Sequence, residues 1–218
     1  MKNIFIYAII ITIFSACSFK TPQDEWKVKS INAFNSYTNN FLKAHENLAK
    51  NDLKRAVKHA KSSADLDTLG RIYLSECALN NSVGISDNCH KYVNLQDLLN
   101  NKNYDAYKDF ILNNFSKDQI KLLPSNYKKF AYNILNNDFK KANKDVRDMK
   151  SITSKLLAAS ILKKHIDIKT INEIIKNTSF YGYKKAVIYW LKELKSKSVS
   201  DIEKSHINKK ILILENSF

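Results

Sequence analysis

Apolar residues recur along this chain at the spacing of helix faces. From Asp24 onward they are separated by about one or two helical turns, and the strict alternation that marks a strand does not occur. This pattern predicts a long first helix with apolar positions Trp26, Ile31, Phe34, Phe41, Leu42 and Leu48. Asn51-Asp52 is predicted to start a second helix, and Asp65 to cap a third.

Helical spacing continues to the C-terminus. Further helices are predicted over 95–99, 104–115, 127–135, 139–149, 152–164, 168–175, 181–194 and 199–214. Sandwiches and barrels need frequent turn residues, whereas the sequence holds only 3 Gly and 2 Pro. We therefore expect an all-α domain over residues 24–218, built as an array of antiparallel helix pairs.

A weak internal repeat accompanies this pattern. Leu48–Leu53, Leu99–Tyr104 and Ile134–Phe139 each place an apolar residue after Asn or Asp. The positions three and seven later are Ala56 and Ala60, Tyr107 and Ile111, and Ala142 and Val146. The segments resemble the turn and second helix of tetratricopeptide-type repeats, a resemblance that implies a concave groove for a peptide or partner helix. An irregular helical bundle with the same helix pairs is the alternative.

The N-terminus has the anatomy of a signal peptide. Lys2 precedes an apolar run over residues 4–14, and the small residues Ser15 and Ala16 follow. The apolar run is about 11 residues long, against the roughly 20 that span a bilayer as a stable helix. The pattern therefore favours a cleaved leader over a permanent transmembrane anchor.

The tetrad Phe14-Ser15-Ala16-Cys17 resembles the lipobox of bacterial prolipoproteins, although the family prefers Leu where Phe14 stands. The resemblance implies a signal peptide over 1–16, cleavage before Cys17 and attachment of lipid to that cysteine, with residues 17–23 as a tether. In lipoproteins of two-membrane bacteria, an Asp directly after the lipidated cysteine resembles an inner-membrane retention signal. This chain has Ser18 at that position. We therefore expect lipid anchoring to a bacterial outer membrane, facing the periplasm.

Two further cysteines lie close together in the predicted domain. Cys77 and Cys89 flank a segment that contains Gly84, and thiols outside the cytoplasm are expected to oxidise. We expect a structural disulfide between them. A metal site with His90 and a pair of free thiols are the alternatives, although the spacing lacks the close ligand pairs of zinc sites.

The sequence is strongly basic, with a formal net charge of +15. Lysines interleave with aromatic residues in three stretches, which makes them candidates for binding polyanions such as lipopolysaccharide, cell wall or imported DNA. These candidates are Lys128, Lys129, Lys140, Lys141, Lys184 and Lys185. An amphipathic surface with inward aromatics and solvated lysines is the alternative. An exported protein would not meet cytoplasmic nucleic acid, so that partner is disfavoured.

Sequence motifs of catalysis are missing. Gly-x-Ser-x-Gly, phosphate loops and His-Glu-x-x-His do not occur, and the five histidines are scattered, so we expect no enzyme, no cofactor and no metal. Glu76 and Glu193 are the nearest candidates for a cell-wall-cleaving acid, without a supporting motif. The leading prediction is a non-enzymatic scaffold that binds an envelope protein or peptide.

Overall fold

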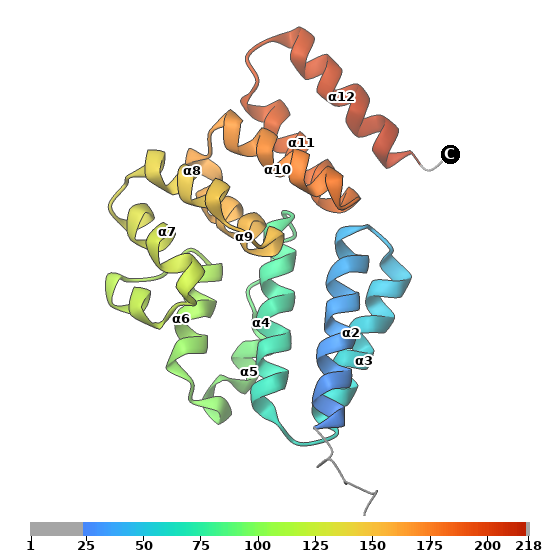
Figure 1. The fold of residues 1–218 in the computed structure, drawn as a ribbon, viewed down its shortest axis with the longest axis vertical. Coiled ribbons are helices and arrows are strands. Elements are labelled where there is room, and N and C mark those ends of the chain that lie inside the picture. The colour runs from blue at the N-terminus through green and yellow to red at the C-terminus, as the bar shows by residue number, and fades with distance from the viewer. Residues whose placement is uncertain (1–23, 217–218) are drawn as a thin grey trace, which may run out of the picture.

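The computed structural model describes residues 24–216, and all regular structure within this range is helical, which confirms the all-α prediction (Figure 1). The α-helices are α2 Glu25–Leu42, α3 Glu46–Lys61, α4 Leu66–Ser82, α5 His90–Leu99, α6 Lys102–Ile111, α7 Ser125–Leu135, α8 Phe139–Asp148, α9 Ile152–Leu162, α10 Ile168–Phe180, α11 Lys184–Lys197 and α12 Asp201–Glu215. Two 3₁₀ helices, η2 Lys117–Leu122 and η3 Lys163–His165, lie between them.

The leader predictions lie outside the described residues. They comprise the signal peptide over 1–16, the lipidated Cys17 and the tether over 17–23. Among the helices of residues 24–216, none has a stretch that is both long and apolar enough to cross a membrane.

Antiparallel helix pairs form the architecture. Neighbouring helices pack as α2 with α3, α4 with α5, α7 with α8, and α10 with α11, and α12 packs on α11 (Figure 1). Helix α4 lies in the middle of the molecule and also contacts α3, α6 and α9. Side chains of these layers meet in one large core, in which Trp190, Tyr92, Phe110 and Phe130 are the largest fully buried residues.

A smaller core joins the first hairpin to α4. It consists of Ala33, Ala56, Ala60, Leu69 and Ile72, all buried. Alanines at two positions on one face of α3 let the helix backbones approach closely. This contact fixes the middle of α2 and the C-terminal half of α3 against the first half of α4.

Helix boundaries differ from the predictions at the first turn. Helix α2 ends at Leu42, and Ala44 adopts a left-handed conformation with φ 64°. The amide of His45 then donates to the carbonyl of Asn40, which closes the turn. The prediction that Asn51-Asp52 starts the second helix is wrong, because α3 runs unbroken from Glu46. Alanine is not a turn residue, so the sequence carried no signal for this turn.

The other two members of the proposed repeat do contain turns. Asn100 ends α5 in a left-handed conformation, and the side chain of Asn101 caps α6. Asn137 is also left-handed, and Asp138 caps α8 by accepting from the amide of Lys141 at 3.1 Å. Only Leu48–Leu53 departs from the pattern, since it lies inside α3. The relationship to tetratricopeptide repeats stays a prediction.

Cys77 and Cys89 are joined as predicted. Their sulfur atoms lie 2.06 Å apart, the distance of a disulfide bond, and link the last turns of α4 to the start of α5. The intervening loop is also held by Asn81, whose side-chain amide donates to the carbonyls of Cys77 and Asp87. Gly84 has φ +77° and faces the ring of Tyr189, so a larger residue would clash there.

Removing the disulfide should destabilise the domain. A Cys77→Ala/Cys89→Ala variant is expected to lose about 3 kcal/mol of unfolding free energy, because the unfolded chain is no longer constrained by a short closed loop. Urea denaturation followed by circular dichroism measures this loss. A reducing agent should produce the same loss in the unmodified protein and none in the variant. Equal stability of the two oxidised proteins would contradict the prediction.

Candidate peptide-binding groove

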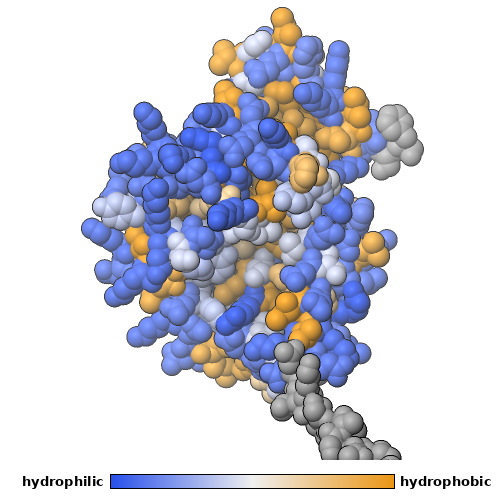
Figure 2. Space-filling view, in the orientation of Figure 1, coloured by the Kyte–Doolittle hydropathy of each residue, from blue (hydrophilic) through white to orange (hydrophobic). Residues whose placement is uncertain are grey.

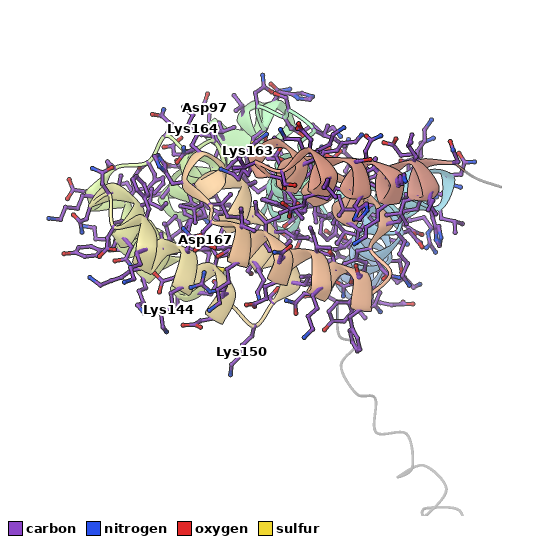
Figure 3. The ribbon with its side chains drawn as sticks, turned by 90° about the horizontal axis from the view of Figure 1, so that it is seen from above. Asp97, Lys144, Lys150, Lys163, Lys164 and Asp167 are labelled. Carbon is purple, nitrogen blue, oxygen red and sulfur yellow. A yellow bond between two sulfur atoms is a disulfide. The ribbon has the colours of Figure 1, made fainter. Side chains whose placement is uncertain are left out.

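A groove runs along one face of the molecule between α2 and α4. Two adjoining cavities of about 230 Å³ and 150 Å³ form it, and they share Phe34, Asn35 and Ser75 as lining residues. Figure 2 shows pale and orange residues in the middle of this face, surrounded by blue hydrophilic ones. In Figure 3, Asp97 of α5 and Lys150 before α9 project from opposite faces. Helix α5 thus covers the far side of α4 and leaves the groove open.

The groove walls follow from helical spacing. Residues three or four positions apart share a helix face, so each helix contributes a row of side chains. Helix α2 supplies Lys27, Ser30, Ile31, Phe34, Asn35 and Thr38, and α4 supplies Thr68, Arg71, Ile72, Ser75, Ala78 and Leu79. Helices α6, α7 and α9 close one end with Tyr107, Tyr127, Thr153 and Leu157.

Two tyrosines form the aromatic end of the groove. The rings of Tyr107 and Tyr127 are stacked, with centroids 5.9 Å apart. Burial raises the pKa of both phenols above the usual value, so both are neutral at physiological pH. This end of the groove is therefore apolar on its faces and polar, but uncharged, at its hydroxyls.

Of the polar side chains in the middle of the groove, one is used by the fold and two can bind a ligand. Thr38 donates its hydroxyl to the carbonyl of Phe34 at 3.1 Å. Among the described residues, the side chains of Asn35 and Ser75 form no hydrogen bond. An amide and a hydroxyl that are not used by the fold can donate to, and accept from, the backbone of a bound chain.

Charges at the other end are already paired. The guanidinium of Arg71 lies 3.0 Å from the carboxylate of Asp67 and donates to the hydroxyl of Tyr104 at 2.5 Å. The hydrogen bond with Tyr104 raises the pKa of Arg71 above its usual value. Lys27 lies 3.9 Å from Asp65. The groove consequently carries little net charge along its length.

The six candidate lysines do not form one surface. Lys128 and Lys129 lie on α7, and Lys140 and Lys141 on α8, whereas Lys184 and Lys185 begin α11 beside the first hairpin (Figure 1). Among residues 24–216, half of the six form salt bridges: Lys129 with Asp145 at 2.9 Å, Lys141 with Asp138 at 2.6 Å and Lys185 with Glu46 at 2.7 Å.

Most aromatics of these basic stretches point inward. Tyr127 and Phe130 are buried, and Phe139 stacks on the ring of His165 with centroids 3.6 Å apart. Phe180 and Tyr181 are exceptions, because 83% and 50% of their surfaces are exposed. The inward aromatics of α7 and α8 match the amphipathic alternative, although Tyr132 on α7 is 51% exposed. Within the three basic stretches, the exposed aromatics are Phe180 and Tyr181, at the turn between α10 and α11.

The two candidate acids are held in ion pairs away from the groove. Glu76 is buried and pairs with Lys91, and its second carboxylate oxygen has no hydrogen-bond partner. Glu193 pairs with Lys163 at 2.7 Å. Since neither carboxylate lines the groove, the groove offers no acid for cell-wall cleavage.

The metal-site alternative does not fit the cysteines. With the sulfurs of Cys77 and Cys89 joined, neither can act as a thiolate ligand beside His90. Over the part of the chain that the structure describes, His, Cys, Asp and Glu side chains nowhere gather in groups of three or more that could hold a metal ion.

The sequence prediction did not single out the groove residues. Asn35, Ser75 and Thr153 lie on three different helices, and each has an ordinary polar side chain at a helical position. Their one signal is that they share faces with apolar residues such as Phe34 and Leu157. These faces form a groove because their helices face one another in the fold. Helical periodicity in the sequence does not show which helices are neighbours.

Comparison of the chain with protein-family models, with curated proteins and with solved structures found no match.

Proposed function

We propose that this chain is a lipid-anchored envelope protein of a bacterium whose helical domain binds a segment of another protein in the α2–α4 groove. The observation that carries the proposal is the chemistry of the groove. It combines apolar and aromatic surface with the unused amide of Asn35 and hydroxyl of Ser75, and its charges are paired. Such a lining suits a peptide backbone and apolar side chains.

Export is supported by two separate features. The leader pattern ends at Cys17 in a lipobox-like tetrad, and the joined pair Cys77–Cys89 is of the kind that persists in oxidising compartments. A protein held by several acyl chains stays on its membrane and can present a binding domain at a fixed distance from it.

The second candidate function is binding of an envelope polyanion, such as lipopolysaccharide, cell wall or imported DNA, by the lysine clusters. Its support is the net charge of +15, together with Lys128, Lys140 and Lys184, which form no salt bridge within residues 24–216. The pairing of the other three lysines and their distribution over separate helices favour the groove.

Loss of the lipid should release the protein from the membrane. A Cys17→Ala variant is expected to lack the acyl chains and to leave the membrane fraction, because the acceptor thiol is missing. Membrane fractionation and intact mass of the two proteins measure this change. An unmodified chain that retains Met1 and stays in the cytoplasm would contradict the anchoring proposal.

Occupancy of the groove can be tested by site-specific crosslinking in cells. A photo-crosslinking amino acid at Asn35 should give a discrete protein adduct, whereas the same group at Ser36, exposed on the face of α2 that points away from the groove, should not. Adding Ser75→Tyr should lower the adduct yield about tenfold, the effect of roughly 1.4 kcal/mol of lost affinity. Equal adducts at both positions would contradict binding in the groove.

Salt distinguishes the two candidate functions. Binding in an uncharged groove should change little between 50 and 200 mM salt, a range over which contacts to several phosphates lose about 10³-fold or more in affinity. The yield of the adduct at Asn35 measures binding in the groove, and retention on lipopolysaccharide or DNA measures binding to a polyanion. A steep salt dependence of the adduct would favour the polyanion function.

A further inference from the structure

The last helix leaves apolar surface uncovered. Helix α12 buries Ile207 and Ile211, and of the helices in the described range α11 is its main contact. Apolar residues elsewhere on α12 stay accessible to solvent, and Ile213 is 62% exposed. Figure 2 shows orange residues gathered between α12 and the helices next to it. The other hairpins have two helices each, whereas α12 has no following helix in the part of the chain that the structure describes.

This apolar surface lines a second groove, which is distinct from the one between α2 and α4. It has a volume of about 500 Å³ and lies between α12 and the α10–α11 hairpin. Its lining residues are Ile175, Ser179, Gly182, Lys184, Val187, Leu191, Lys210, Ile213 and Leu214. We call it the C-terminal groove.

The length of the C-terminal groove matches a short helix. Lys184, Val187 and Leu191 lie on one face of α11, and they cover two helical turns, or about 10 Å at 1.5 Å per residue. An amphipathic helix that docks there would insert apolar side chains at positions i, i+3 or i+4, and i+7. An extended chain would instead leave many backbone groups unpaired against this apolar lining.

Positive charge at the rim of the C-terminal groove favours an acidic occupant. Lys184 and Lys210 stand on opposite walls, no acidic residue lines the groove, and neither lysine forms a salt bridge within residues 24–216. Glu215, which is near the end of α12, is paired with Lys192 at 2.7 Å. A second copy of this chain in a symmetric contact through this groove would bring its own Lys184 and Lys210 to these lysines, which places like charges together.

We propose that the C-terminal groove binds an amphipathic helix of a partner protein, with apolar anchors in the groove and acidic residues beside Lys184 and Lys210. Bound in this way, the helix pairs with α12 as α11 pairs with α10. The proposal does not depend on the function of the α2–α4 groove, because the two grooves share no lining residue.

The test uses the full chain in lipid nanodiscs and a designed 16-residue helical peptide with Leu at positions i, i+3 and i+7 and flanking Glu residues. The peptide should bind, and Lys210→Glu should weaken binding about tenfold through like-charge repulsion. Lys209→Glu is the matched control, since Lys209 is exposed on the same helix outside the groove. Empty nanodiscs correct for binding to lipid.

Two further comparisons make the result specific. A matching peptide with Lys in place of Glu should bind weakly to the unmodified protein and regain affinity for the Lys210→Glu variant. Ile213→Asn should abolish binding, whereas Ile202→Asn, at the other end of α12, should not. Equal effects of the two lysine substitutions overturn the proposal. Saturable binding of lauric acid in the groove without binding of the Glu peptide also overturns it, because the occupant is then an acyl chain.

Discussion

Burial of α4 is the constraint on which the rest of this structure depends. A helix that is packed on most sides must present apolar or small residues around nearly its whole circumference, and α4 does so, with buried positions from Thr68 to Ser82. Gly70 faces α5, and a Cβ there would lie 2.6 Å from the side chain of Leu99, which would have to shift. The disulfide fastens the other end of the same pair. The face of α4 that α5 does not cover borders the groove, so the site is a consequence of how the helices pack.

Local signals in the sequence account for the helices better than for their ends. Capping predictions succeeded where a side chain does the capping, as at Asp65, which accepts from the amide of Thr68 at 3.2 Å. The predicted helix start at Asn51-Asp52 failed, because the chain turns earlier, at Ala44, a residue that does not prefer the left-handed conformation it adopts there. Helix α6 ends at Ile111, before the predicted end at residue 115, because Asn113 is left-handed and the chain continues into η2. Asn readily adopts this conformation, so the sequence did carry a signal for this turn. Helix boundaries that depend on tertiary contacts cannot be predicted from the residues next to them in the sequence.

The candidate functional surfaces could likewise be predicted only where local sequence features determine them. The pairing of Cys77 and Cys89 could be inferred because proximity in the chain and expected export both restrict it. The basic stretches could be located but not interpreted, since Lys129 differs from Lys128 only in facing Asp145 on the neighbouring helix. The α2–α4 groove could not be located at all, because its lining comes from five helices. Spatial neighbours, which the sequence does not reveal, decide the second and third cases.

The distribution of charge differs between the two grooves, and it predicts different occupants for them. At physiological ionic strength, charges act over about 8 Å, so lysines on remote helices add little inside either groove and mainly raise the rate of encounter with acidic proteins. In the α2–α4 groove Arg71 and Lys27 face acids of the domain itself, so selection there falls to shape and hydrogen bonds. In the C-terminal groove Lys184 and Lys210 keep their charge available beside apolar surface. One strongly basic domain can therefore hold an uncharged segment and an acidic helix together, because neither occupant competes for the contacts that the other needs.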